Sequence, residues 1–142
     1  MATLQSLARR LNDEADKIDD KASDIAAEAA EVVITALVYD TPVDTSKALS
    51  NWQVTLGSAS STSIPPHALG VGGSTRAVSA DTAIRLAQAV LAGKQPGQTI
   101  YISNSLPYIR RLNSGWSKQH PGAFVEAAIL LARNYVRERY GG

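Results

Sequence analysis

Cysteine is absent from the 142 residues, and aromatic side chains make up only 6% of them. The absence of cysteine excludes disulfide bonds, thiolate metal sites and cysteine catalysis. The scarcity of aromatic rings means that a core must be built from aliphatic side chains and alanine. The two histidines, His67 and His120, lie far apart in the sequence. A histidine-based metal cluster is therefore not expected, and we expect no metal and no cofactor.

Long hydrophobic runs are absent too. The most apolar stretch, residues 25–38, contains Glu28 and Glu31 and is too short to cross a membrane. The basic pair near the N-terminus is not followed by an apolar run, so a secretory signal is not expected. With 44% hydrophobic and 19% charged residues, the composition is typical of a folded chain. The length predicts a single domain over 1–142.

Charge is divided unevenly along the chain. Residues 1–40 carry four basic and nine acidic side chains, whereas the remaining residues carry ten basic and four acidic ones. A uniformly basic surface for nucleic acid is therefore not expected. Opposite charge on two parts of one chain favours head-to-tail packing of copies. Solvated helix faces followed by a basic tail explain the same pattern.

Apolar residues recur at alternating spacings of four and three through the first helix of the chain. This stripe contains Leu4, Ala8, Leu11, Ala15, Ile18, Ala22, Ile25, Ala29, Val32 and Ala36. It predicts one helix over 1–40, roughly 50 Å long at about 1.5 Å per residue. A compact domain of this size is about 30 Å across, so part of the helix must stand exposed or lie on another chain. After Ile25 the stripe broadens, because Ala30, Val33 and Leu37 join it. The helix either forms oligomers or lies along its own sheet, and we favour a mixture in which this second half packs on the domain.

The first helix is followed by turn residues and a short strand. Pro42 should end the helix, because proline lacks an N–H group and disfavours helical backbone before it. Asp44 or Thr45 should cap a short second helix that runs to Asn51. Alternating apolar and polar residues then predict a strand over 52–56.

The middle of the chain is low in complexity. Serine, proline and glycine dominate residues 58–76, which predicts a flexible loop or arm. The glycines of this segment do not form a phosphate-binding loop, because no Gly-Lys-Ser/Thr sequence follows them. A further helix is predicted over 80–93, with Ser79 or Asp81 as its cap.

The last third predicts a second strand and a closing helix. The strand should span 99–104, where β-branched and aromatic residues gather. An irregular segment over 108–119 should follow it. A C-terminal helix is predicted over 121–140, with Pro121 at its first position and arginines near its end.

No group of residues identifies a catalytic site. Asp16, Asp19, Asp20 and Asp24 lie on or near one face of the first helix, away from the apolar stripe. Carboxylates need burial in a cleft to act as acids or bases, so we expect these to be solvated. An enzyme is therefore not expected. Basic and aromatic residues do alternate at Tyr108, Arg110, Arg111 and Trp116, which leaves nucleic-acid binding as an alternative.

Two blocks of residues carry a resemblance to a known family. The first block is Thr41-Pro42-Val43-Asp44-Thr45, after the long helix, with Trp52 in the next strand. The second block contains Asn104, Pro107, Tyr108, Gly115, Trp116, Ser117, Gln119, Pro121, Gly122 and Phe124. In this order and spacing, the blocks at 41–52 and 102–126 resemble the tailed-phage neck proteins. These are the head–tail joining or tail-completion proteins, often called minor tail proteins. Many of them have glycine where Ser46 stands here.

The resemblance implies an α+β fold. A long N-terminal helix and a C-terminal helix would pack on one face of a small, mainly antiparallel sheet, with an inserted loop and helix. The residues of the two blocks would act mainly as fold determinants. Asn104 would tie the strand end to a turn, Gly115 would adopt a positive φ, and Trp116 would fill the seam beside the last helix.

The same resemblance implies a structural virion protein that is made in the bacterial host cytoplasm. It would form a ring, a hexamer or dodecamer, in the phage neck between the head connector and the tail tube. Its partners would be its own copies and other neck and tail-tube proteins, with DNA only passing through the lumen. No membrane would be involved. The candidate interface residues are Leu4, Ala8, Leu11, Ala15, Ile18, Ala22, Arg110 and Arg111.

Two alternatives remain open at this level. A tail-terminator protein also forms a ring, and the sequence barely distinguishes it from a joining protein. A regulatory or nucleic-acid-binding module would use the basic and aromatic residues near Arg110. Its binding would weaken steeply with salt.

If the apolar stripe forms the contact between copies, replacing Ala15 and Ala22 with Glu should break the assembly. The added carboxylates would have to be desolvated in an apolar seam. Light scattering of the purified protein over a range of concentrations measures this directly. An unchanged mass would contradict an interface at the stripe.

Overall fold

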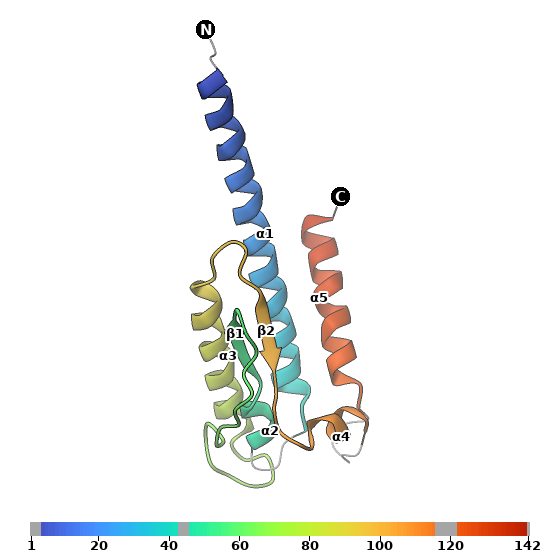
Figure 1. Cartoon of the computed structure of the whole chain (residues 1–142). Helices are drawn as coiled ribbons and strands as arrows, with labels where there is room; N and C mark the ends of the chain where they lie inside the picture. The colour runs from blue at the N-terminus through green and yellow to red at the C-terminus, as the bar shows by residue number, and fades with distance from the viewer. Residues whose placement is uncertain (1–3, 43–45, 116–121, 142) are drawn as a thin grey trace.

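The computed structural model describes residues 4–42, 46–115 and 122–141. Figure 1 shows the order of the elements along the chain. They are α1 (Leu4–Asp40), α2 (Lys47–Ser50), β1 (Gln53–Leu56), α3 (Arg76–Ala92), β2 (Ile100–Ser103), α4 (Ile109–Asn113) and α5 (Phe124–Tyr140). Both predicted strands are present, each slightly shorter than expected.

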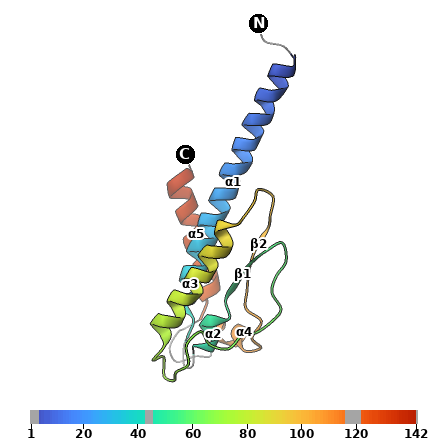
Figure 2. The same cartoon turned by 90° about the vertical axis from the view of Figure 1, so that its left-hand side faces the viewer.

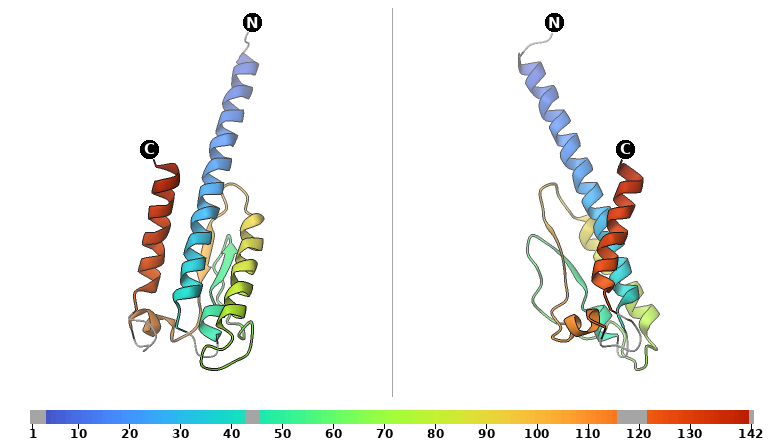
Figure 3. Two further views of the ribbon diagram at one scale, coloured as in Figure 1. Left: turned by 180° about the vertical axis from the view of Figure 1, so that it is seen from behind. Right: turned by 90° about the vertical axis from the view of Figure 1, so that its right-hand side faces the viewer.

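The helices form one layer and the strands lie on one side of it. In Figure 1 and Figure 3, α1 lies between α3 and α5, and the two strands lie against α1 and α3. Figure 2 shows the strands on the same side of all three helices. β1 and β2 pair antiparallel, with Val54 opposite Ile102. The predicted α+β fold, with both terminal helices on one face of a small antiparallel sheet, is confirmed.

The core is aliphatic and rich in alanine, as the scarcity of aromatic residues requires. Phe124 is its one phenylalanine and is completely buried. The remaining buried members come from α1, α2, β1, α3 and α5, including Ile34, Leu37, Val38, Leu49, Val54, Ala80, Ala83, Ala87 and Ala128. The buried alanines of α3 have short side chains, which allows its axis to approach the neighbouring helix closely. Ala30 and Leu37, which were expected to broaden the stripe after Ile25, belong to this core, and Val33 and Ala36 pack against it. Ile34 and Val38 of the core lie on a neighbouring face that the stripe did not include.

The end of α1 is fastened to the start of β1. The helix ends at Asp40, so the expected stop before Pro42 is confirmed. Thr41 is completely buried. Its hydroxyl donates to the Leu37 carbonyl at 2.5 Å and accepts a hydrogen bond from the Trp52 indole at 2.8 Å. Two residues of the first sequence block are thus bonded to each other.

The cap of α2 differs from the expectation. Asp44 and Thr45 lie outside the described residues, as does Val43, and Ser46 occupies the N-cap position. Ser46 is buried and has a left-handed φ of 68°. A left-handed backbone is the conformation that glycine adopts most readily.

The segment over 58–76 is attached to the domain and does not project as an arm. Asn51 is completely buried, and its amide donates to the carbonyls of Lys47 and Ile64 and accepts from the Ile64 N–H, each at 2.8 Å. The Ser50 hydroxyl accepts from the N–H of His67 at 3.0 Å. His67 is consequently half-buried, not exposed, and burial lowers its pKa.

The inserted helix begins earlier than predicted. α3 starts at Arg76, with Thr75 at its N-cap position. Ser79 was expected to be a cap, but it lies inside the helix and is completely buried. Its hydroxyl accepts a hydrogen bond from the N–H of Ala68 at 3.1 Å. The serine therefore fastens the preceding loop, which explains why a polar side chain is retained at a buried helical position.

The region before the last helix contains a short helix that sequence patterns did not predict. α4 spans Ile109–Asn113 within the segment expected to be irregular. α5 begins at Phe124 and not near residue 121, and Pro121 itself lies outside the described residues. Gly122 has a φ of 100°, and a Cβ atom there would lie 2.6 Å from the backbone nitrogen of Gly115. Only glycine fits at this crossing of two backbone segments.

Replacing Asn51 with Ala should destabilise the protein by about 2–4 kcal/mol, because both buried backbone groups of Ile64 lose their partner. Urea unfolding followed by circular dichroism measures the loss. The matched control is Asn134→Ala on the exposed surface of α5, which should change stability by less than about 0.5 kcal/mol. Equal stability of the two variants would contradict this role of Asn51.

Candidate assembly surface

The N-terminal half of α1 extends beyond the rest of the domain (Figure 1). The first α1 residue that packs against the core cluster is Ala27. Residues 4–22, which we call the overhang, carry the first part of the predicted stripe. Leu4 is 86% exposed, Leu11 62% and Ile18 68%. A row of large apolar side chains in water is unfavourable, at about 25 cal/mol for each Å² of apolar surface.

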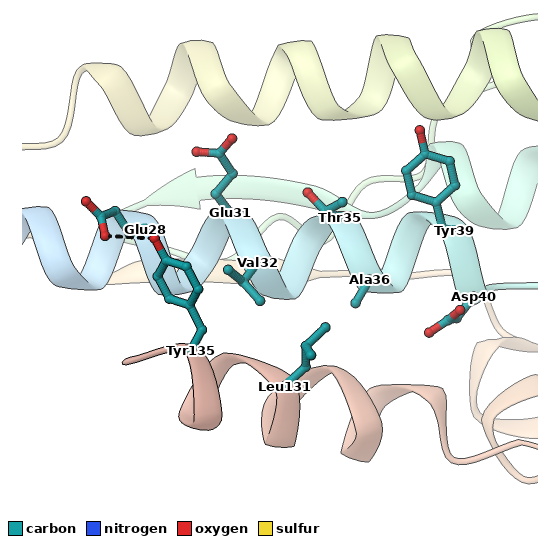
Figure 4. A pocket seen from close by; sticks show the side chains of 9 residues that line it. All are labelled: Glu28, Glu31, Val32, Thr35, Ala36, Tyr39, Asp40, Leu131 and Tyr135. Carbon is teal, nitrogen blue, oxygen red and sulfur yellow. Dashed lines mark hydrogen bonds between the residues drawn. The ribbon is translucent and has the colours of Figure 1, made fainter. Parts of the chain in front are cut away.

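The second half of the stripe faces α5. Val32 and Ala36 lie opposite Leu131 in Figure 4, and Ala29 borders a groove together with Ile129 on the other side of the same helix pair. The stripe is therefore used in two ways along a single helix. From Ile25 onward it packs within the chain, and over the overhang it meets no other part of the described chain.

α5 exposes more apolar surface than its sequence pattern indicated. Phe124, Ala128 and Ala132 form its buried side. Three consecutive large residues, Ile129, Leu130 and Leu131, are 43%, 57% and 53% exposed. Over residues 127–132 the helix is apolar on every side, and a helical segment of this kind is normally enclosed by partners. The six consecutive apolar residues from 127 to 132 are the sequence signal that would have identified this surface.

Two grooves run along the junction of α1 and α5, and their charged borders have opposite sign. The first has a volume of about 550 Å³ and carries Glu28, Glu31 and Asp40 beside its apolar residues. We call it the acidic groove, and Figure 4 shows it. The second, the basic groove, has a volume of about 420 Å³ and is lined by Ala29, Val33, Ile129, Ala132, Arg133, Val136 and Arg137.

Glu28 holds the end of α5 against α1. One of its carboxylate oxygens accepts hydrogen bonds from the Tyr140 hydroxyl at 2.7 Å and the Tyr135 hydroxyl at 3.2 Å. Arg139 forms an ion pair with the same oxygen at 3.2 Å. The hydrogen bond from Tyr140, with further help from Tyr135 and Arg139, lowers the pKa of Glu28 below its ordinary value of 4.5, although partial burial opposes the shift. The carboxylate fixes α5 close to the place where the overhang leaves the domain.

Three described residues of the two sequence blocks, Thr41, Trp52 and Asn104, form hydrogen bonds that connect elements of the fold. The Asn104 amide donates to the Ala48 carbonyl at 2.9 Å, and its oxygen accepts from the Leu106 N–H at 3.2 Å. Gly115 has the expected positive φ, at 89°. Pro107 and Tyr108 are exposed. The remaining residues of the two blocks lie outside the described residues; they are Val43, Asp44, Thr45, Trp116, Ser117, Gln119 and Pro121.

The candidate interface residues are divided between the two ends of the molecule. Arg110 and Arg111 are exposed on α4, at the end opposite to the overhang (Figure 1). They therefore cannot form one continuous patch with Leu4, Leu11 and Ile18 of the same chain. Tyr108 lies next to α4, so the described part of the basic and aromatic cluster is small.

Neither a metal-binding group nor a membrane-spanning helix is found among the described residues. Within ranges 4–42, 46–115 and 122–141, no three acidic or histidine side chains are grouped in a way that could hold a metal ion. None of the helices in these ranges combines the length and apolarity needed to span a bilayer. The acidic residues of the overhang are exposed, as expected for solvated side chains.

Comparison of the chain with models of known families, with curated proteins and with solved structures finds no match.

Protonation of Glu28 should loosen the end of α5. Because the folded state lowers this pKa, the stabilisation is present above about pH 4.5 and is lost as the pH falls through the lowered value. Hydrogen-exchange protection of residues 137–140 should decrease over that range. Glu28→Gln should already show reduced protection at neutral pH. Glu138→Gln on the same helix is the control, and wild-type protection in Glu28→Gln would contradict the role of the carboxylate.

Proposed function

We propose that the chain is a structural virion protein of a tailed bacteriophage. It forms a ring in the neck and joins the tail tube to the head connector. The observation that carries this proposal is the overhang, a long helical segment whose large apolar side chains Leu4, Leu11 and Ile18 are mostly exposed. A protein whose work is adhesion needs such surfaces, and it needs no catalytic cleft.

The position of Ser46 supports the resemblance on which the virion assignment rests. Many neck proteins have glycine at this position. Ser46 adopts a left-handed φ of 68°, which a serine adopts only at some energetic cost. The backbone at this position therefore has the conformation that the family's glycine favours.

The internal contacts of the two sequence blocks support the same proposal. The Thr41–Trp52 and Asn104–Ala48 hydrogen bonds hold α1, α2 and the two strands together. The proposal places the protein in the virion, after synthesis in the host cytoplasm.

Electron microscopy of a phage that lacks the gene tests the proposed function. The expected result is filled heads and separate tails of normal length, with joined particles restored when the wild-type gene is supplied. Tails of uncontrolled length would instead identify a tail terminator. Normal virions would contradict any role in the neck.

Gel-shift experiments test the nucleic-acid alternative. The exposed Arg110 and Arg111 beside Tyr108 are its only described support. For a neck protein we expect no specific shift with single- or double-stranded DNA. Strong, steeply salt-dependent binding that is lost on replacing both arginines would favour the alternative.

A further inference from the structure

The geometry points to a specific contact between copies: the overhang of one chain lies in the basic groove of the next. The overhang contributes its apolar stripe, and the groove contributes the apolar walls between α1 and α5. This contact deepens the proposed function and rests on it for its biological role. It is a physical property of the chain itself, however, and can be tested separately.

The occupant of the groove must come from another copy. α1 is a single continuous helix of 37 residues, and the overhang points away from the domain (Figure 3). The overhang is about 28 Å long at about 1.5 Å per residue. It cannot turn back onto its own groove unless the helix breaks, and residues 4–40 contain no proline or glycine.

Both surfaces combine small and large apolar side chains. The stripe alternates the large residues Leu11 and Ile18 with the small Ala15 and Ala22. The groove likewise combines small and large residues, with Ala29 and Ala132 between the bulkier Val33, Ile129 and Val136. Large side chains of one helix pack over small residues of its neighbours in closely packed helices. The contact would cover the exposed Ile129 as well as the overhang.

Charge selects the basic groove over the acidic one. Glu14 lies three residues after Leu11, Asp19 four residues after Ala15 and Lys21 three residues after Ile18, so two acidic residues and one basic residue border the stripe. Glu14 also forms an exposed ion pair with Lys17 at 3.4 Å, so the net charge beside the stripe is only slightly negative. Arg133 and Arg137, one helical turn apart, border the basic groove. Among the described residues, neither arginine forms an ion pair. In the acidic groove, Glu28, Glu31 and Asp40 would repel the same overhang.

The contact joins two different surfaces of the same chain. Each copy gives its overhang to one neighbour and receives the overhang of another in its groove. A contact of this kind repeats from copy to copy and produces a closed ring when the rotation between neighbours allows closure. A neck ring therefore requires no second type of contact between copies.

Cross-linking of single-cysteine variants tests the contact. The chain has no cysteine, so Ala15→Cys and Ile129→Cys each introduce a unique thiol, one on the overhang and one in the basic groove. A short bifunctional maleimide should link the two variants when they are mixed and should link neither variant to itself. Leu131→Cys is the matched control, because it lies on the same helix but lines the acidic groove.

Three outcomes would overturn the contact. Linking of Ala15→Cys to itself would mean that overhangs pair with one another. Preferential linking of Ala15→Cys to Leu131→Cys would place the overhang in the acidic groove. A protein that stays monomeric and unlinked at the highest attainable concentration would show that the purified chain does not make the contact.

Charge reversal provides an independent measurement by sedimentation equilibrium. Arg133→Glu with Arg137→Glu should weaken self-association by at least about tenfold, because two attractive pairs become repulsive. Mixing this variant with one that carries Glu14→Arg and Asp19→Arg should restore association. Reversing Lys47 and Arg85 instead should have no effect, because both are exposed and line neither groove. An equal loss in that control would show that overall charge, and not the groove, governs association.

The outcomes separate this contact from the proposed function. A chain that cross-links as expected but is not needed to join heads to tails would leave the contact standing and overturn the neck assignment. A chain that is needed for joining but does not cross-link would overturn the contact alone.

Discussion

The length of α1 constrains everything else in this protein. A helix of 37 residues is about 55 Å long, and the rest of the described chain packs against the part from Ser23 onward. The helix thus has two environments along one continuous backbone. Its C-terminal half organises the domain, because α3, α5 and the sheet all contact it. Its N-terminal half extends an apolar stripe into solvent, where only another molecule can cover it.

The domain below the overhang is held together by side chains that bond to distant backbone groups. Thr41 joins the end of α1 to Trp52, Asn51 holds the loop at Ile64, and Asn104 connects β2 to Ala48. The part of the chain that the structure describes has two short strands, and aromatic rings are few, so backbone ladders and aromatic packing contribute little to fixing the loops. Hydrogen bonds from buried amides and hydroxyls hold the loops instead. Those of Asn51, Ser50 and Ser79 attach the segment over 58–76 to the domain.

Packing α5 onto α1 creates surface features that neither helix has alone. The two helices meet through small residues, which leaves a groove on each side. Acidic side chains of α1 border one groove, and arginines of α5 border the other. The acidic N-terminal part and the basic C-terminal part of the sequence therefore place opposite charges on the two faces of this helix pair. Glu28 and its tyrosine partners hold that pair together next to the overhang.

The sequence by itself determined the elements whose signal is local. Periodic spacing predicted α1 and its excess length, Pro42 predicted where it ends, and alternation predicted β1 and β2. These signals depend on neighbours within a few residues. Only the tertiary structure decided which face of α1 enters the core, that Ser79 is a buried loop anchor and not a cap, and that the apolar residues of α5 remain exposed. Only the tertiary structure also formed the two grooves. These features depend on contacts between segments far apart in the chain, and no spacing within one segment specifies them.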